Sequence, residues 1–263
     1  ISADGTITFT NNIFSNNTAN QDGAGAYVFL NYYGNAIFTN NTFSGNTTDW
    51  FGGGVYVSTG VGSITFTNNT FSGNAARRNG GGAFVYSNSI SQTIRSTITL
   101  TNNIFSGNTT ISDGGGAYVY SNGGGVYVYL ASGTFNLTNN TFSGNRAQSY
   151  GGGAYVIISE DETTANVYNN IFWQNIADPG ERSGNDLHVL SDANNNNIAS
   201  TVNLYNNNFS GTAKDIFITL VQPGRYNHGG NIQQNPRFVN ASAGDFRLQV
   251  GSACINAGNN NAP

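Results

Sequence analysis

The stretch NNTFSGN at residues 68–74 decides the fold, because it returns in exact or closely varied form six more times along the 263-residue chain. The copies begin at Asn11, Asn40, Asn68, Asn102, Asn139, Asn169 and Asn206, at intervals of 28 to 37 residues. A unit of this length, repeated with tolerance for insertions, is typical of a solenoid whose neighbouring units stack on one another.

The residues just before each copy alternate strictly between apolar and polar. Thr or Asn fills most of the intervening positions, and every residue two and four places before the first Asn is apolar. These apolar residues are Ile7, Phe9, Ala36, Phe38, Ile64, Phe66, Ile98, Leu100, Phe135, Leu137, Ala165, Val167, Val202 and Leu204. A period of two with one apolar face predicts a β-strand.

Two further columns follow in each unit. A Phe stands three residues after the first Asn, at Phe14, Phe43, Phe71, Phe105, Phe142, Phe172 and Phe209. An Asn stands six residues after it in all units but the last, at Asn17, Asn46, Asn74, Asn108, Asn145 and Asn175. We expect the Phe column to fill the interior and the Asn column to form a structural ladder of side-chain hydrogen bonds at corners, where Asn tolerates a left-handed backbone.

A Gly-rich segment then completes the unit, as in GGGVYV at 52–57 and GGGAFV at 80–85. Three short strands separated by Asn and Gly corners describe one coil, and stacked coils bury one continuous core. We therefore predict an all-β fold, a right-handed parallel β-helix of about seven to nine coils with three short strands per coil. We expect one domain over 1–263, with regular repeats over 1–218 and an irregular closing segment over 219–263.

FSGN at 71–74 together with GGGAF at 80–84 resembles the repeats of chlamydial polymorphic outer-membrane proteins and of secreted bacterial right-handed β-helix proteins. The segment NPRFVNASAGDFRLQVGSACINAG at 235–258 is similar to the one that closes the helix in the secreted group. The resemblance implies the fold. It does not imply one activity, because the proteins that carry such repeats include adhesins, surface proteins and glycan-active enzymes.

Composition excludes several classes of function. Only 8% of residues are charged, and the nine Lys and Arg residues form no basic stripe, so we expect no nucleic-acid partner. The single cysteine, Cys254, excludes an intrachain disulfide. No run of 18 apolar residues occurs, so we expect no transmembrane helix. The polar, charge-poor composition favours an extracellular or cell-surface protein, and the start at Ile1 favours a mature or trimmed product.

Titratable residues gather in one stretch, 160–192. They are Glu160, Asp161, Glu162, Asp178, Glu181, Arg182, Asp186, His188 and Asp192. One interpretation is a cation or sugar site made by two loops. The other, which we favour, is a pair of solvated loops, because no ligand spacing recurs. We accordingly predict no catalytic residue, no metal site and no cofactor, and we expect a protein that is not an enzyme.

The Gly-rich strands carry the most informative pattern. Small residues such as Ala83 and Val85 occupy alternate positions of each strand and should point inward. The aromatic residues at the positions between them should then form a strip that points outward. The strip comprises Tyr27, Tyr56, Phe84, Tyr118, Tyr155, His188 and Phe217, with Phe29, Tyr86 and Tyr120 two residues further on. Such a surface is larger than solitary exposed residues require. Alternatively, the insertions at 87–97 and 121–133 fold over the strip, or the register is inverted and Tyr lies in the core.

These patterns favour a non-enzymatic extracellular structural or adhesive protein. The strand pattern begins at Ile1, so the first coil should offer an open sheet edge, and such edges invite pairing with another chain. Alternatively, a segment outside this sequence caps the edge. We expect self-association, end to end or lateral, with a surface filament as one outcome. The alternative is a glycan-binding or glycan-cleaving protein that stacks sugar rings on the aromatic strip. A polysaccharide or a cell surface is then the partner.

Overall fold

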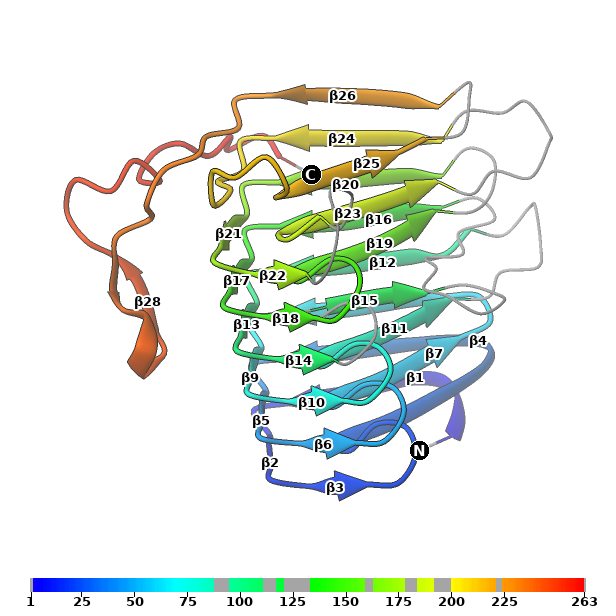
Figure 1. The fold of residues 1–263 in the computed structure, drawn as a ribbon. Coiled ribbons are helices and arrows are strands. Elements are labelled where there is room, and N and C mark those ends of the chain that lie inside the picture. Colours follow the sequence, from blue (N-terminus) through cyan, green and yellow to red (C-terminus); the bar gives the residue numbers. More distant parts are fainter. Residues whose placement is uncertain are drawn as a thin grey trace.

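A computed structural model describes residues 2–87, 95–110, 117–120, 133–158, 163–177, 184–191, 200–220 and 224–262 of the chain, excluding the side chains of 2–4, 32 and 117–120. The chain is a right-handed parallel β-solenoid, in which every strand of the rod pairs in parallel with its equivalents in the coils above and below (Figure 1). The predicted fold class is confirmed.

Each coil holds four strands, as the third coil illustrates with β8 (Ser63–Thr67), β9 (Thr70–Ser72), β10 (Ala75–Ala76) and β11 (Ala83–Ser87). The two-residue strand follows the ladder Asn and adds to the three strands expected. It is too short to show any alternation in the sequence. Its backbone still pairs with both neighbouring coils, since Ala75 aligns with Thr47 on one side and Thr109 on the other.

Stacking the coils gives the rod four faces. Face 1 carries the Gly-rich strands: β4 (Ala26–Thr39), β7 (Val55–Thr59), β11, β15 (Ala117–Tyr120), β19 (Ala154–Ile158), β23 (Leu187–Ser191) and β25 (Ile216–Thr219). Face 2 carries the strands that precede the Asn pairs: β1 (Ser2–Thr10), the end of β4, β8, β12 (Thr97–Thr101), β16 (Thr134–Thr138), β20 (Thr164–Tyr168), β24 (Thr201–Tyr205) and β26 (Arg225–Gly229). The long strand β4 joins these two faces into one sheet.

The other two faces are narrow. Face 3 consists of β2 (Ile13–Ser15), β5 (Thr42–Ser44), β9, β13 (Ile104–Ser106), β17 (Thr141–Ser143) and β21 (Ile171–Trp173). Face 4 consists of β3 (Thr18–Ala19), β6 (Thr47–Thr48), β10, β14 (Thr109–Thr110), β18 (Arg146–Ala147) and β22 (Ile176–Ala177). Six coils of the described chain therefore hold all four strands, and β24, β25 and β26 continue the stack.

Left-handed corners turn the chain from face to face. The first Asn of each pair adopts this conformation, with a φ of 56° at Asn68, and so does the Gly of the Ser-Gly corner, with 60° at Gly73. A third corner precedes face 1, where Gly80 has a φ of 69° and a Cβ would lie 2.5 Å from the Ala83 carbonyl oxygen. Asn and Gly are the residues that accept this backbone with little strain, which explains their spacing.

The core is a column of stacked rings and aliphatic side chains. Phe43, Phe71, Phe105, Phe142 and Phe172 are fully buried, and neighbouring rings of this column lie 4.6 to 4.9 Å apart and nearly parallel. That separation matches the spacing of strands in a sheet, so a register of identical residues fixes the packing. The apolar residues of faces 1 and 2 complete the same core cluster.

Two asparagine ladders run through the interior. In the ladder predicted from the sequence, the Asn46 side-chain nitrogen donates to Asn74 Oδ1 (2.9 Å) and to the Phe14 carbonyl (2.9 Å). Asn74 and Asn108 repeat this arrangement toward Asn145. A second ladder joins the second Asn of each pair, through Asn12, Asn41, Asn69, Asn103, Asn140, Asn170, Asn207 and Asn231. Within each pair, one Asn turns the corner and the other supplies the ladder.

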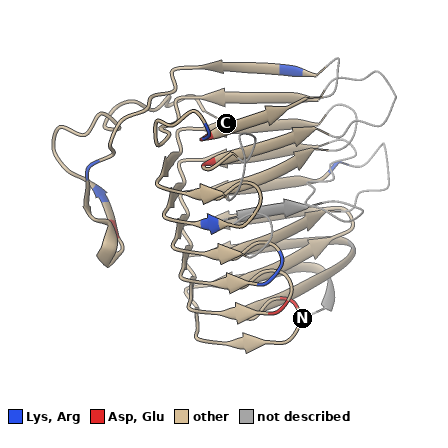
Figure 2. Cartoon of the chain, viewed as in Figure 1, with Lys and Arg blue, Asp and Glu red and all other residues tan. Residues whose placement is uncertain are grey.

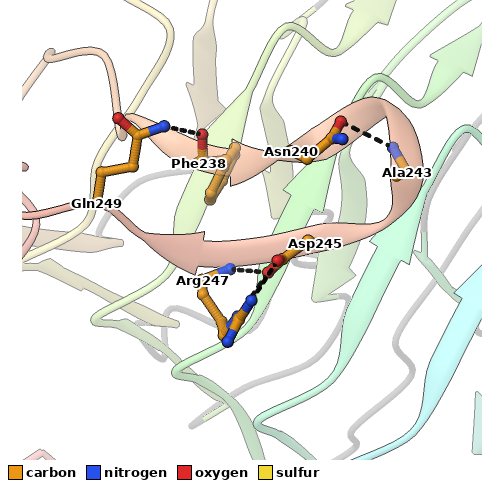
Figure 3. Close-up of polar contacts among 6 residues, drawn as sticks. All are labelled: Phe238, Asn240, Ala243, Asp245, Arg247 and Gln249. Carbon is orange, nitrogen blue, oxygen red and sulfur yellow. Dashed lines mark hydrogen bonds and ion pairs between the residues drawn. The ribbon is translucent and has the colours of Figure 1, made fainter.

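The end of the chain leaves the rod as a hairpin. β27 (Phe238–Asn240), the 3-10 turn η1 (Ala241–Ala243) and β28 (Asp245–Leu248) form a small antiparallel unit that stands beside the stack (Figure 1). Within it, Asn240 caps the turn and Arg247 pairs with Asp245 at 2.6 Å (Figure 3). After the hairpin the chain returns to the rod, where Asn169 exchanges two hydrogen bonds with the backbone of Asn259 (2.8 and 2.9 Å).

Candidate functional site

The outer side of face 1 is the main candidate site, and its register follows the predicted parity. Val28, Val57, Val85, Val156 and Val189 are buried in the core cluster, so the alternate side chains point away from it. Tyr27 stacks on Tyr56 at 4.9 Å and Tyr56 on Phe84 at 5.0 Å. His188 lies 4.7 Å from the Tyr155 ring and 5.0 Å from the Phe217 ring. The inverted register is therefore wrong.

The aromatic strip is not one continuous exposed surface, which corrects the sequence-based expectation. Phe84, Tyr155 and His188 are buried. The ring of Phe51 lies 4.8 Å from that of Phe84, and the ring of Tyr150 lies 5.7 Å from that of Tyr155 and 5.0 Å from that of His188. Phe51 and Tyr150 lie in the turn between faces 4 and 1, so this turn lays aromatic side chains over the strip.

Exposure concentrates at the beginning of the strip. Tyr27 and Phe29 are 41% and 44% exposed. Phe29 and Tyr86 flank Ser58 in register, because each pairs with it on an adjacent strand. A small side chain between two rings leaves a cavity of about 270 Å³, lined by Phe29, Ser58 and Tyr86 together with Leu30, Asn31, Thr59 and Gly60.

Ser58 forms the floor of this cavity. Its hydroxyl is buried and makes no hydrogen bond of normal geometry with the residues that the structure describes. Burial raises the pKa of the Tyr56 phenol, two residues before Ser58 on the same strand. The site thus offers two rings, a gap between them where the small Ser58 stands, and one buried hydroxyl. It can hold a planar or ring-shaped group, and it presents no carboxylate among its lining residues.

Some predicted site residues lie outside the part of the chain whose side chains are described. Those of the aromatic strip are Tyr118 and Tyr120, whose backbone belongs to β15. Those of the titratable stretch are Glu160, Asp161, Glu162, Asp178, Glu181, Arg182 and Asp192. Of that stretch the structure describes the side chains of Asp186 and His188. Asp186 lies inside the rod, and His188 lies on the outer side of face 1.

Asp186 ends the predicted asparagine ladder inside the rod. Its Oδ1 accepts from the Asn175 amide (2.9 Å), and its Oδ2 accepts from the Ser210 backbone N–H (2.8 Å). A carboxylate only accepts, so it suits a ladder whose amides all donate toward the following coil. Burial raises the pKa of Asp186 to about 6, and the nearby Asp215 carboxyl adds to the rise. The residue is a structural terminus of the ladder.

A second cavity, of about 360 Å³, lies between the sixth coil and the hairpin. Trp173, Gln174 and Arg237 are among its lining residues, and sequence reasoning missed all three. A signal existed, because FWQN at 172–175 is the copy that departs furthest from FSGN. Arg237 carried no such signal, since it lies beyond the repeats.

Charge is sparse on the described chain. Figure 2 shows basic and acidic residues scattered over the ribbon, with no face dominated by either sign. Within the described ranges no three His, Cys, Asp or Glu residues come together as metal ligands would. The same residues include no helix with the length and apolar character to cross a membrane.

Comparison with known proteins agrees with this geometry. Residues 1–132, half of the chain, match the family model described as a right handed beta helix region. No curated protein and no solved structure gives a significant match. The repeat, the parallel register and the family model together establish that the chain belongs to the right-handed β-helix family.

Proposed function

We propose that this protein is a non-enzymatic extracellular structural and adhesive β-helix, which associates with other copies of itself through the exposed start of the aromatic strip. One observation carries the proposal. Tyr27 and Phe29 remain more than two-fifths exposed, whereas Phe84 and Tyr155 of later coils are covered by side chains of their own chain. Exposed aromatic side chains in a row are typical of association surfaces.

The rest of the rod suits a structural role. Two buried amide ladders and a continuous stack of rings join every coil to the next, which favours a stiff body over a hinged one. A stiff rod can hold a lateral contact at a fixed position along its length. Lateral association of this kind produces a bundle or a filament when the contact does not close on itself.

Sedimentation velocity over a range of protein concentrations tests the proposal. We expect the wild-type chain to form larger species as concentration rises, and a Tyr27→Ser, Phe29→Ser double variant to remain monomeric. Tyr226→Ser is the matched control, because Tyr226 is also 41% exposed but lies on face 2. A wild-type protein that stays monomeric at every concentration, or a control that loses association equally, would contradict the proposal.

The cavity at Ser58 supports a second candidate function, the binding of a glycan. Phe29 and Tyr86 stand two strands apart, a separation of about 9.6 Å, which accommodates one ring stacked between them. Binding of the wild-type chain to immobilised polysaccharides, lost in a Ser58→Phe variant that fills the gap, would favour this candidate. Mass spectrometry of the same polysaccharides after incubation would show whether any of them is cleaved.

A further inference from the structure

The sixth coil differs from all the others at one corner of the rod. Between face 3 and face 4 the other units have Ser followed by Gly or Asn, whereas this coil has Trp173 followed by Gln174. The interior residues on either side, Phe172 and Asn175, keep their usual places in the core and the ladder. The exchange therefore alters the outer surface and leaves the packing of the coil unchanged.

The backbone at this corner is strained by the exchange. Gln174 has a φ of 55°, in the left-handed region that Gly occupies at 60° to 64° in four other coils. Arg237, at the start of the hairpin, has a φ of 53°. Apart from Asn and Gly, these two are the residues of the described chain with positive φ. Strained residues that persist in a fold often mark a functional position.

Both strained residues line the same cavity, between the rod and the hairpin. The other lining residues are Trp173, Asn235, Phe238, Ala241 and Gln249, so its walls combine two aromatic rings, three amide side chains and one guanidinium. Figure 3 shows the hairpin wall, where Gln249 donates to the Phe238 carbonyl (3.1 Å) and ties the two strands together. A backbone hydrogen bond just outside the two strands also joins the arms of the hairpin, since the Gln249 N–H donates to the Arg237 carbonyl (2.9 Å).

The hairpin is held in place at both of its ends. Before it, Ile232 bridges to Asn208 of the seventh coil, and after it, the backbone of Asn259 binds the Asn169 side chain. An isolated two-stranded hairpin is marginally stable in water, so these attachments position it as a fixed wall. The cavity is consequently formed before any ligand arrives, which lowers the entropic cost of binding.

The charge in the cavity comes from Arg237. Its guanidinium donates to the Gly251 carbonyl (3.3 Å) and forms no ion pair with the described residues. Asp245, on the second strand of the same hairpin, is paired with Arg247, which binds it through two side-chain hydrogen bonds (2.9 and 2.6 Å). A guanidinium without an ion-pair partner among the described residues is suited to bind a carboxylate, through two parallel hydrogen bonds.

We propose that this cavity binds an acidic saccharide. A sugar ring stacks on Trp173, its carboxylate pairs with Arg237, and its hydroxyl groups bond to the amides of Gln174, Asn235 and Gln249. Amide side chains both donate and accept, as hydroxyl groups require. A nucleic acid fits poorly, because the described chain places one cation here and no basic surface around it. The proposal is independent of self-association through Tyr27 and Phe29, which lie in the first coil.

Tryptophan fluorescence can report on the site directly. The chain has two tryptophans, so a Trp50→Phe background leaves Trp173 as the single tryptophan whose emission is followed. The probes are glucuronic acid and its oligosaccharides, with glucose and glucose oligosaccharides as neutral counterparts. We expect a saturable change with the acidic probes, at least tenfold tighter binding than for the neutral ones, and the loss of that preference in Arg237→Gln. Equal responses to both probe series, or no response to either, would overturn the proposal.

A second variant separates binding from folding. Trp173→Ser with Gln174→Gly restores the dipeptide found in the second to fifth coils, so it should fold and melt as a normal rod. Because it lacks Trp173, its binding is measured by calorimetry with the same acidic oligosaccharides. We expect no detectable heat of binding, whereas a variant that binds as tightly as the wild type would show that the corner is not part of a saccharide site.

Discussion

The inner and outer sides of the same coils use asparagine in very different ways. Inside, the side chain of Asn108 is fully buried and donates to both Asn145 and the Phe71 carbonyl. Outside, on face 2, Asn166 is partly exposed and donates to Asn136 (2.9 Å). The inner ladder recurs in coil after coil, whereas the outer one begins at Asn136 and continues through Asn203 to Asn227. The repeat is thus imposed by the interior, and the outer surface is free to vary and to acquire function.

The largest effect should come from the ring column. Phe105→Ala removes a fully buried ring that stacks between Phe71 and Phe142 at 4.6 and 4.9 Å. We expect a loss of about 3–5 kcal/mol in the free energy of unfolding, measured by chemical denaturation. Phe29→Ala, which removes the same group from the exposed side, should cost less than about 1 kcal/mol. Similar losses for the two variants would contradict the distinction between inside and outside.

The inner ladder should be the next most sensitive feature. Asn108→Ala removes the oxygen that accepts from both the Asn74 backbone N–H and the Asn74 side chain (3.0 and 2.9 Å). It also leaves the Phe71 carbonyl without the Asn108 donor. Because buried polar groups without partners are costly, we expect a loss of about 3 kcal/mol by the same method. Asn166→Ala on the outer ladder is the control, and a cost there above about 1 kcal/mol would weaken the comparison.

The buried carboxyl group of Asp186 should make the stability of the folded protein depend on pH. Its pKa is about 6 in the folded chain and 3.8 as the ordinary value, so the folded state holds a proton that the unfolded state has released between these values. Stability should therefore be highest below about pH 4 and fall by about 2–3 kcal/mol as pH rises to about 6. Urea denaturation at a series of pH values measures this slope. Asp186→Asn should flatten it, and an unchanged slope would show that another group is responsible.

The sequence was sufficient for the fold because the coils are in register. A column such as Phe71, Phe105 and Phe142 repeats in the chain because the same side chain must stack at every level of the rod. The same repetition predicted that Val57 points into the core and that Tyr56 points outward. The different structural roles of the two residues in each Asn pair were not predicted, since both residues recur equally often. Only their backbone shows that Asn68 turns the corner while Asn69 carries the ladder.

The candidate sites were harder to predict because they depend on residues that do not repeat. Phe51 and Tyr150 cover parts of the aromatic strip from turns whose sequences differ between coils, so no column reveals them. Arg237 reaches the corner at Trp173 through a segment that lies outside the repeats. Departures from the repeat are nevertheless informative, as FWQN at 172–175 shows.

The strained corner gives the smallest and most specific prediction. Gln174→Gly should raise the free energy of unfolding by about 1 kcal/mol, because Gly adopts the positive φ with less strain. The reverse exchange, Gly144→Gln in the fifth coil, should lower it by a similar amount. A Cβ at Gly144 meets no atom within 4 Å, so the cost there is conformational rather than steric. Differential scanning calorimetry of both variants measures the pair. If the two changes were both neutral, the left-handed backbone would carry no strain, and the sixth-coil corner would lose that mark of a functional position.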